Sequence, residues 1–377
     1  MPDGHTLQAW GWIMMDLLLD TRYFYNNTLS GQEKRLYRFM AFLLLERRYK
    51  FYYVIDRTLL PDDKSPEIPR FFLSFGPSDE SCDLEKTIEA LHWDFPEIFY
   101  ANALFFEVDP DYLVHLGGKR MPVYTDKEID EISRALHALS HRFDLISDEF
   151  ELELAVHDYI TREFDYDDLV DERTGREYKE CFNVVGLIKR GVGVCGALSF
   201  LMQFILQQHG ITVANIVKAL ADDDEIYHSW LAVRIDGKFY HVDITFDEAE
   251  STSPDEPQYT SFNITDDEIF ETHGTLGDAY PNIVCNSIDA NYYVRKGLYF
   301  KTAEALIQAM KDFIFRYRDS SRDTLYFYFR TPHITEAREI TAKLKEVAEY
   351  AKELGITFRD IEVGVNSHGY GAVSFLM

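Results

Sequence analysis

The chain has few cysteines and few basic residues for its 377 residues. The four cysteines, Cys82, Cys181, Cys195 and Cys285, show no CxxC spacing, which argues against a disulfide framework and a zinc site. Only 38 basic residues stand against 65 acidic ones, so the net charge of −27 argues against binding to nucleic acid or anionic membranes. Met1–Asp20 has no basic leader, and no apolar run reaches the length of a membrane span. We therefore expect a cytoplasmic protein without membrane insertion, metal or cofactor.

The pattern along the chain predicts three regions. Residues 1–145 are expected to be mainly helical, residues 146–297 to form the core domain, and residues 298–377 to form a small α/β unit. Helix starts are indicated at Ser30, Asp83, Thr125 and Ser147, two of which, Ser30 and Thr125, have Glu three residues later. The expected fold class is α+β.

A two-residue hairpin is predicted in the middle of the chain. Asp236-Gly237 is a strong hairpin signal, and it lies between the alternating runs Tyr227–Ile235 and Lys238–Phe246. The turn pairs Ile235 with Lys238, the two residues that flank it. It thereby fixes the register of every other pair, and a slip of one residue would reverse the faces.

This register gathers polar side chains on one face of the hairpin. His228, Trp230, Asp243 and Thr245 are predicted to share that face, and His228 and Asp243 are diagonal neighbours about 7 Å apart. An imidazole and a carboxylate at that separation can form a hydrogen bond. The opposite face is apolar and is predicted to be core, with Leu231, Val233, Ile235, Tyr240, Val242 and Ile244.

Cys195 is predicted to begin an apolar helix that ends near Gly210. The N–H groups and the dipole at a helix N-terminus favour a thiolate. An apolar stripe is expected to pack on the sheet and bring Cys195 to His228; it comprises Leu198, Leu201, Met202, Ile205 and Leu206. A thiolate, a base and an orienting carboxylate, here Asp243, are what cysteine catalysis requires. The other cysteines, and His157, His209 and His241, are interpreted as structural.

The motifs that hold these residues resemble the transglutaminase-like core, a branch of the papain-like cysteine hydrolase superfamily. That family carries G-V-C at the start of a helix, H-x-W on a strand and D-x-T-[WF]-D on the next. Here these runs are Gly193-Val194-Cys195, His228-Ser229-Trp230 and Asp243–Asp247. The resemblance implies a papain-like fold in which the cysteine helix packs on an antiparallel sheet. It also implies that Cys195 is the nucleophile, His228 the general base and then acid, and Asp243 the orienting carboxylate.

The reaction implied by the resemblance is acyl transfer from a peptide or amide through a thioester. We expect hydrolysis, as in a protease or amidase, rather than cross-linking to an amine, with a peptide or protein as substrate. Asn183 and Trp230 are the candidates for contact with the oxyanion or the substrate. The family often has C-x-G-Y-A and H-x-W-N, whereas Gly196-Ala197-Leu198 and Leu231 occur here. A catalytically weak or inactive binding or scaffold module therefore remains the alternative, and the oligomeric state stays open.

Overall fold

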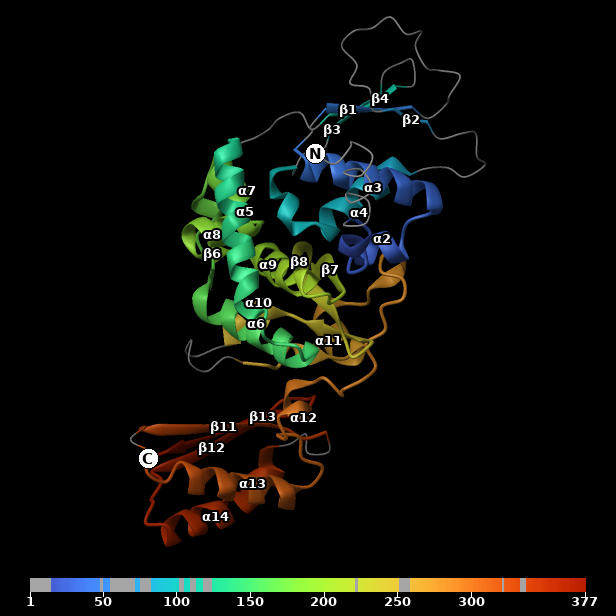
Figure 1. Cartoon of the computed structure of the whole chain (residues 1–377). Coiled ribbons are helices and arrows are strands. Elements are labelled where there is room, and N and C mark those ends of the chain that lie inside the picture. The colour runs from blue at the N-terminus through green and yellow to red at the C-terminus, as the bar shows by residue number, and fades with distance from the viewer. Residues whose placement is uncertain are drawn as a thin grey trace, which may run out of the picture.

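The computed structural model is shown in Figure 1. It describes residues 15–47, 50–54, 72–74, 83–101, 105–108, 113–117, 124–220, 223–250, 258–320, 322–332 and 337–377. In these ranges no helix is both long enough and apolar enough to cross a membrane. Cys82, and residues 1–14 of the region predicted to be mainly helical, lie outside the described residues.

A four-stranded antiparallel sheet forms the centre of the fold. Its strands are β7 (Val213–Leu220), β8 (Asp223–Ile235), β9 (Lys238–Val242) and β10 (Phe262–Ile264), in the order β10-β9-β8-β7. The hairpin between β8 and β9 has the predicted register, from the pair Ile235 and Lys238 to the pair Leu231 and Val242. The turn residues both have positive φ, 49° for Asp236 and 79° for Gly237, as a type I′ turn requires.

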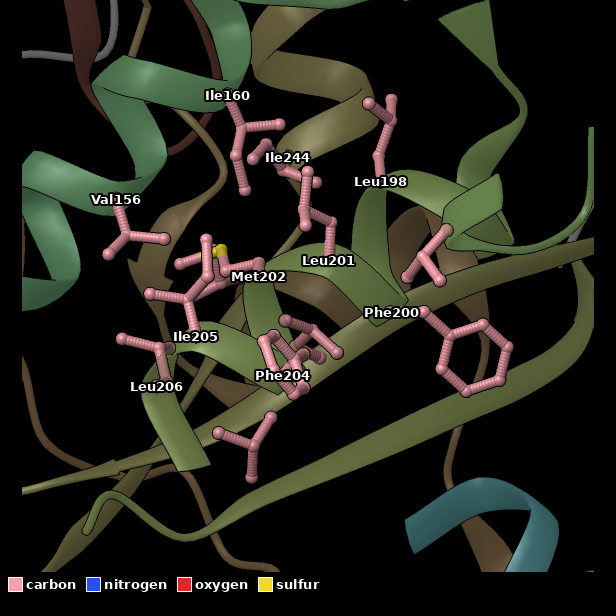
Figure 2. Close-up of a cluster of buried hydrophobic side chains, with 14 of the residues drawn as sticks. Val156, Ile160, Leu198, Phe200, Leu201, Met202, Phe204, Ile205, Leu206 and Ile244 are labelled. Carbon is pink, nitrogen blue, oxygen red and sulfur yellow. The ribbon is translucent and has the colours of Figure 1, made fainter. Parts of the chain in front are cut away.

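The helix that carries the cysteine, α9 (Cys195–Gln208), lies against one face of this sheet. It is followed by Gly210 with a φ of 87°, the expected left-handed end. Figure 2 shows Val156 and Ile160 facing the apolar side chains of α9. These two residues belong to α6 (Glu149–Glu163), so helices cover α9 on the side away from the sheet. The α+β fold class, with the cysteine helix on an antiparallel sheet, is confirmed.

The second face of the sheet is also buried. Leu231 and Val233 point into the core around α9, whereas Trp230 and Ala232 lie in a second core with the N-terminal helices. These are α2 (Tyr23–Asn27), α3 (Gly31–Leu45) and α4 (Leu84–Asp94). The alternation along β8 therefore separates two apolar cores and does not separate core from solvent.

One predicted strand is shorter than expected, because a helix begins inside it. The run Lys238–Phe246 was predicted to be extended, but β9 ends at Val242 and α10 (Ile244–Glu250) follows. The Asp243 side chain accepts hydrogen bonds from the N–H groups of Thr245 and Phe246, as an N-cap residue does. The alternating apolar pattern gave no sign of this cap. Thr245, predicted to share the hairpin face with His228, lies in α10 instead.

Most predicted helix starts are confirmed. Ser30 and Thr125 form capping boxes, and Asp83 caps α4. Asp148, and not Ser147, caps α6, because its carboxylate accepts the N–H of Glu151. The other helices around the sheet are α5 (Asp126–Ser140), α7 (Gly175–Glu180), α8 (Val184–Arg190), α11 (Asp266–His273) and α12 (Tyr292–Arg295), with short 3-10 turns at Pro96–Ala101, His141–Phe143, Val170–Glu172 and Gly277–Ala279.

Two small sheets precede α9 in the chain. The first has the order β2-β1-β4-β3, formed by β1 (Lys50–Val54), β2 (Phe72–Ser74), β3 (Phe105–Val108) and β4 (Leu113–Gly117). The second pairs β5 (Asp165–Tyr166) in parallel with β6 (Val192–Gly193), immediately before Cys195. This second pair links the end of α6 to the cysteine.

The C-terminal part has its own apolar core. Helices α13 (Ala303–Arg316) and α14 (Ala337–Glu353) cover a sheet of order β11-β13-β12, formed by β11 (Thr324–Arg330), β12 (Asp360–Val365) and β13 (Tyr370–Leu376) (Figure 1). Gly369, with a φ of 78°, ends the turn that connects β12 to β13. The division of the chain at residues 145 and 297 stays a prediction.

Candidate active site

Cys195 is the first residue of α9. The side chain of the preceding residue, Val194, makes no capping hydrogen bond, so the first N–H groups of the helix are left to other acceptors. Cys195 is partly exposed, whereas Cys181 and Cys285 are buried. Burial, followed by the nearby Asp167, raises the pKa of the Cys181 thiol to about 11. Among the described cysteines, Cys195 is therefore the one that a reagent can reach.

A polar seam attaches α9 to the sheet one turn after the cysteine. The Ser199 hydroxyl donates to the Ser229 carbonyl at 3.2 Å, and the Ser229 hydroxyl donates to Asn215 at 2.9 Å. Ser229 follows His228 directly in β8. We predicted that the apolar stripe would bring Cys195 to His228, but the residues that bond to β8 are polar, and α9 is buried on nearly all sides.

His228 connects the cysteine to a carboxylate. Its Nε2 lies 2.7 Å from Asp243 Oδ2, and the Cys195 side chain also acts on its charge. Burial alone would lower the pKa of His228. The negative charge of Asp243, its hydrogen bond and the Cys195 side chain outweigh burial and raise the pKa of His228 to about 10. The structure thus brings the three predicted residues together, and the imidazole is held as an imidazolium at neutral pH.

Asp243 is fully buried and satisfied on both oxygens. Oδ1 accepts the two N–H groups at the start of α10, and Oδ2 accepts His228 and His273. Burial works against the charged carboxylate, but His228 and then His273 lower the pKa of Asp243 to about 2. The carboxylate therefore stays ionised and fixed in place.

Two residues near the site were not anticipated. His273, the last residue of α11, bonds to Asp243 at 2.8 Å. Tyr166 stands on β5, paired with Gly193, and burial and then the Cys195 charge raise the pKa of its phenol. Tyr166 lies 29 positions before the cysteine in the chain and His273 lies 30 positions after Asp243. Only the strand pairing and the placement of α11 could reveal them.

Asn183 and Trp230 have structural roles. The Asn183 side chain caps α8 by accepting the Val185 N–H at 2.9 Å, and its amide donates to the Lys179 carbonyl at 3.1 Å. Both ends of the amide are thus engaged with the backbone, and the geometry does not support its use as an oxyanion donor. Trp230 has no exposed surface, and its ring stacks 6.3 Å from His228, so its expected contact with substrate is not supported either.

A second buried carboxylate–histidine network borders the site. His157 bonds to Asp247 at 3.1 Å, one turn beyond Asp243 in α10. Glu153, one turn before His157 in α6, is fully buried and accepts the Asn263 amide at 2.6 Å. Burial raises the pKa of Glu153 to about 8, although Asn263 and His157 act against this. These groups lie beneath the site and hold α6 against α10.

Among the residues that the structure describes, two groups of side chains have ligand atoms within 4.8 Å of one another and so could hold a metal: His228 with Asp243 and His273, and His241 with Asp266 and Cys285. In the first group one carboxylate oxygen already accepts both imidazoles. In the second, the Trp230 N–H donates to His241 Nδ1 at 3.2 Å, which places the histidine proton on Nε2, facing Asp266. Both groups are satisfied as hydrogen-bond networks, and we assign no metal to them.

The sequence of residues 138–244 matches the transglutaminase-like superfamily, and this segment contains Cys195, His228 and Asp243. No curated protein matches the chain. One similar solved structure is a candidate cysteine protease from Cytophaga hutchinsonii, with 19% identity, a TM-score of 0.23, and coverage of 33% of this chain and 43% of the other. Another is described as a TGase, with 15% identity, a TM-score of 0.31, and coverage of 52% of this chain and 57% of the other.

The chain spans about half the length of these two structures. The superfamily match covers the helix that carries the cysteine and the strands that carry the histidine and lead to the aspartate. Residues 138–244 of the chain therefore form a transglutaminase-like segment.

Proposed function

We propose that the protein is a cysteine-dependent acyl-transfer enzyme that hydrolyses a peptide or amide bond. The observation that carries this proposal is the position of His228, which bonds to Asp243 at 2.7 Å and whose pKa is raised by Asp243 and by the Cys195 side chain. An ionised carboxylate behind an imidazolium, with a thiol at a helix N-terminus in front, favours the thiolate.

In this mechanism the Cys195 thiolate attacks the carbonyl carbon of the scissile amide. The carbonyl oxygen takes the negative charge and meets the backbone N–H of Cys195 at the start of α9. Tyr166 pairs with Gly193, two residues before the cysteine, and its phenol is the candidate for the second donor. His228 gives its proton to the leaving amine, and the C–N bond breaks to leave a thioester.

Water completes the reaction. The neutral His228 takes a proton from the water as it attacks the thioester, the C–S bond breaks, and the thiolate and imidazolium are restored. Asp243 keeps the imidazole oriented through both steps. An amine in place of water would give cross-linking by the same chemistry, and we favour water as the acceptor.

The first test is alkylation of the thiol by iodoacetamide between pH 5 and 10, followed by peptide mass mapping. Wild-type Cys195 is expected to react at a substantial rate already at pH 6, whereas Cys195 in His228→Ala is expected to react only as pH approaches about 8.5. Identical profiles with a midpoint near 8.5 would contradict the proposal. Cys181 and Cys285 provide internal references because both are buried.

A second test separates the enzyme from a binding module that has kept the fold without catalysis. A peptide-library cleavage screen with the full chain is expected to show turnover that Cys195→Ala abolishes. Incorporation of a fluorescent primary amine into a glutamine-containing protein measures cross-linking in parallel. Activated Cys195 without cleavage or incorporation would favour the binding module.

A further inference from the structure

His273 shares the catalytic carboxylate with His228. It ends α11, is 1% exposed, and its Nε2 lies 2.8 Å from Asp243 Oδ2. The same oxygen lies 2.7 Å from Nε2 of His228. The two imidazole rings are 5.3 Å apart and approach this one oxygen from two elements. The carboxylate is thus held by a second ring as well as by the N–H groups of α10.

The orientation of His273 is fixed by its surroundings. Its Nδ1 lies 2.6 Å from the Thr272 hydroxyl, whose oxygen is 3.3 Å from the Ile269 carbonyl. The rings of Trp230 and Phe246 flank it, with centroids 4.7 Å and 4.9 Å away. Polar contacts at both ring nitrogens and aromatic rings around it leave His273 one position, in which it donates to Asp243.

The second hydrogen bond changes how strongly the carboxylate holds the His228 proton. A carboxylate oxygen that accepts a second hydrogen bond is less basic than one that accepts a single bond. It therefore stabilises the protonated form of His228 less strongly. The imidazolium must be stable enough to keep the thiolate, yet it must release its proton to the leaving amine. The titratable groups that face His273 are Asp243, His228 on β8 and His241 on β9.

We propose that His273 is a positioning residue of the acyl-transfer site. It anchors Asp243 and draws part of the carboxylate charge away from His228, so that the imidazolium can act as an acid. This inference rests on the proposed function, because it assigns His273 a part in that reaction. His273 acts on the reaction through its hydrogen bond to Asp243 and not through contact with the substrate.

The test compares His273→Leu and His273→Gln in the full chain. Leucine cannot donate a hydrogen bond, whereas the glutamine amide can restore one to Asp243. With the best peptide from the cleavage screen, His273→Leu is expected to lower kcat about 10–100-fold, as loss of an orienting partner does, with little change in KM. His273→Gln is expected to recover most of kcat. His241→Leu, which breaks another buried histidine–carboxylate bond, controls for general loosening.

The pH profile of Cys195 alkylation supplies a readout that a merely structural role would not move. In His273→Leu the step assigned to loss of the His228 proton is expected to shift to higher pH, because Asp243 then acts on His228 alone. An unshifted step with wild-type kcat, or equal damage from Gln and Leu, would overturn the role of His273. An unactivated thiol in the wild-type protein would instead overturn the proposed function, and with it this inference.

Discussion

The backbone N–H of Thr245 donates to Asp243 at 3.0 Å, so the carboxylate that faces His228 also caps α10. One oxygen begins a helix and the other orients an imidazole. The end of β9, the start of α10 and the position of the acid are thus set by one side chain.

Asp243→Asn is expected to separate these two roles. Asparagine caps helices as well as aspartate does, so α10 and the melting temperature are expected to be largely kept. Its amide would point N–H groups at His228 and favour the tautomer that cannot accept the thiol proton. The rate of peptide cleavage is expected to fall by up to ~10⁴, the loss seen for the corresponding change in a serine protease triad.

Asp243→Ala is the companion variant, since it removes the cap as well. Compared with Asp243→Asn, it is expected to lower the free energy of unfolding by about a further 0.5–2 kcal/mol, measured by urea denaturation. Asp266→Asn, beside the buried His241, serves as the control for loss of a carboxylate charge. Equal cleavage rates in Asp243→Asn and wild type would contradict the orienting role.

Stability is expected to fall as pH rises, because of Glu153. Its pKa is about 8 in the folded chain against an ordinary value of 4.5, so between these values the folded chain holds a proton that the unfolded chain has lost. His157, with its pKa raised to about 9 by Asp158 and Asp247 against the effect of burial, acts in the same direction. Its stabilisation is complete below 6.5 and is lost as pH rises through 9.

Glu153→Gln removes the first of these contributions and keeps an acceptor for Asn263. The variant is expected to be more stable than wild type at pH 8 by on the order of 1–3 kcal/mol and similar at pH 5. Thermal unfolding at the two pH values measures this. Glu163→Gln, exposed at the end of the same helix, is the matched control. A pH-independent difference would contradict the buried, protonated state of Glu153.

Gly193→Ala is expected to displace the cysteine. A Cβ at Gly193 would lie 2.6 Å from the Ala197 Cβ and 3.0 Å from Leu187, so the backbone before Cys195 must move. We expect a loss of about 1–3 kcal/mol in unfolding free energy and slower alkylation at pH 6. A Cβ at Gly196 meets only the Phe182 carbonyl, at 3.4 Å, and Gly196→Ala is expected to stay within about 1 kcal/mol of wild type.

Tyr166→Phe tests the second oxyanion donor. Loss of one such donor is expected to lower kcat by ~10²–10³ while KM and the alkylation rate of Cys195 stay near wild type, because the phenol meets charge only in the transition state. Tyr178→Phe, on the partly exposed ring of α7, is the control. An unchanged kcat would contradict the role of Tyr166, and the second donor beside the Cys195 N–H would then be another group.

The sequence predicted the parts of the site that depend on short-range rules. The Asp236-Gly237 turn determined which β8 and β9 residues pair, and the apolar run between Cys195 and Gly210 indicated the helix that begins at the cysteine. The rest depends on contacts between distant segments. His273 and Tyr166 reach the site from other elements, and the seam at Ser199 and Asn215 has no periodic signal.

The prediction that Asn183 is an oxyanion donor depended on a residue type that has two common uses. An asparagine ahead of a helix is as well suited to capping as to catalysis, and Asn183 caps α8. Likewise Asp243 fitted an alternating strand pattern, although a carboxylate is also among the strongest helix-start signals. In both cases one residue type satisfied two local rules, and only the surrounding structure decided between them.

Both faces of the central sheet are buried. The segment that matches the superfamily, residues 138–244, is therefore expected to be shorter than the segment that can fold by itself. Residues 138–244 include Trp230 and Ala232, whose cover comes from helices near the start of the chain. A fragment trimmed to those limits would present this apolar surface to water and would be expected to aggregate. We therefore expect the boundaries of homology and of autonomous folding to differ in this protein, and a fragment made for expression needs to follow the second.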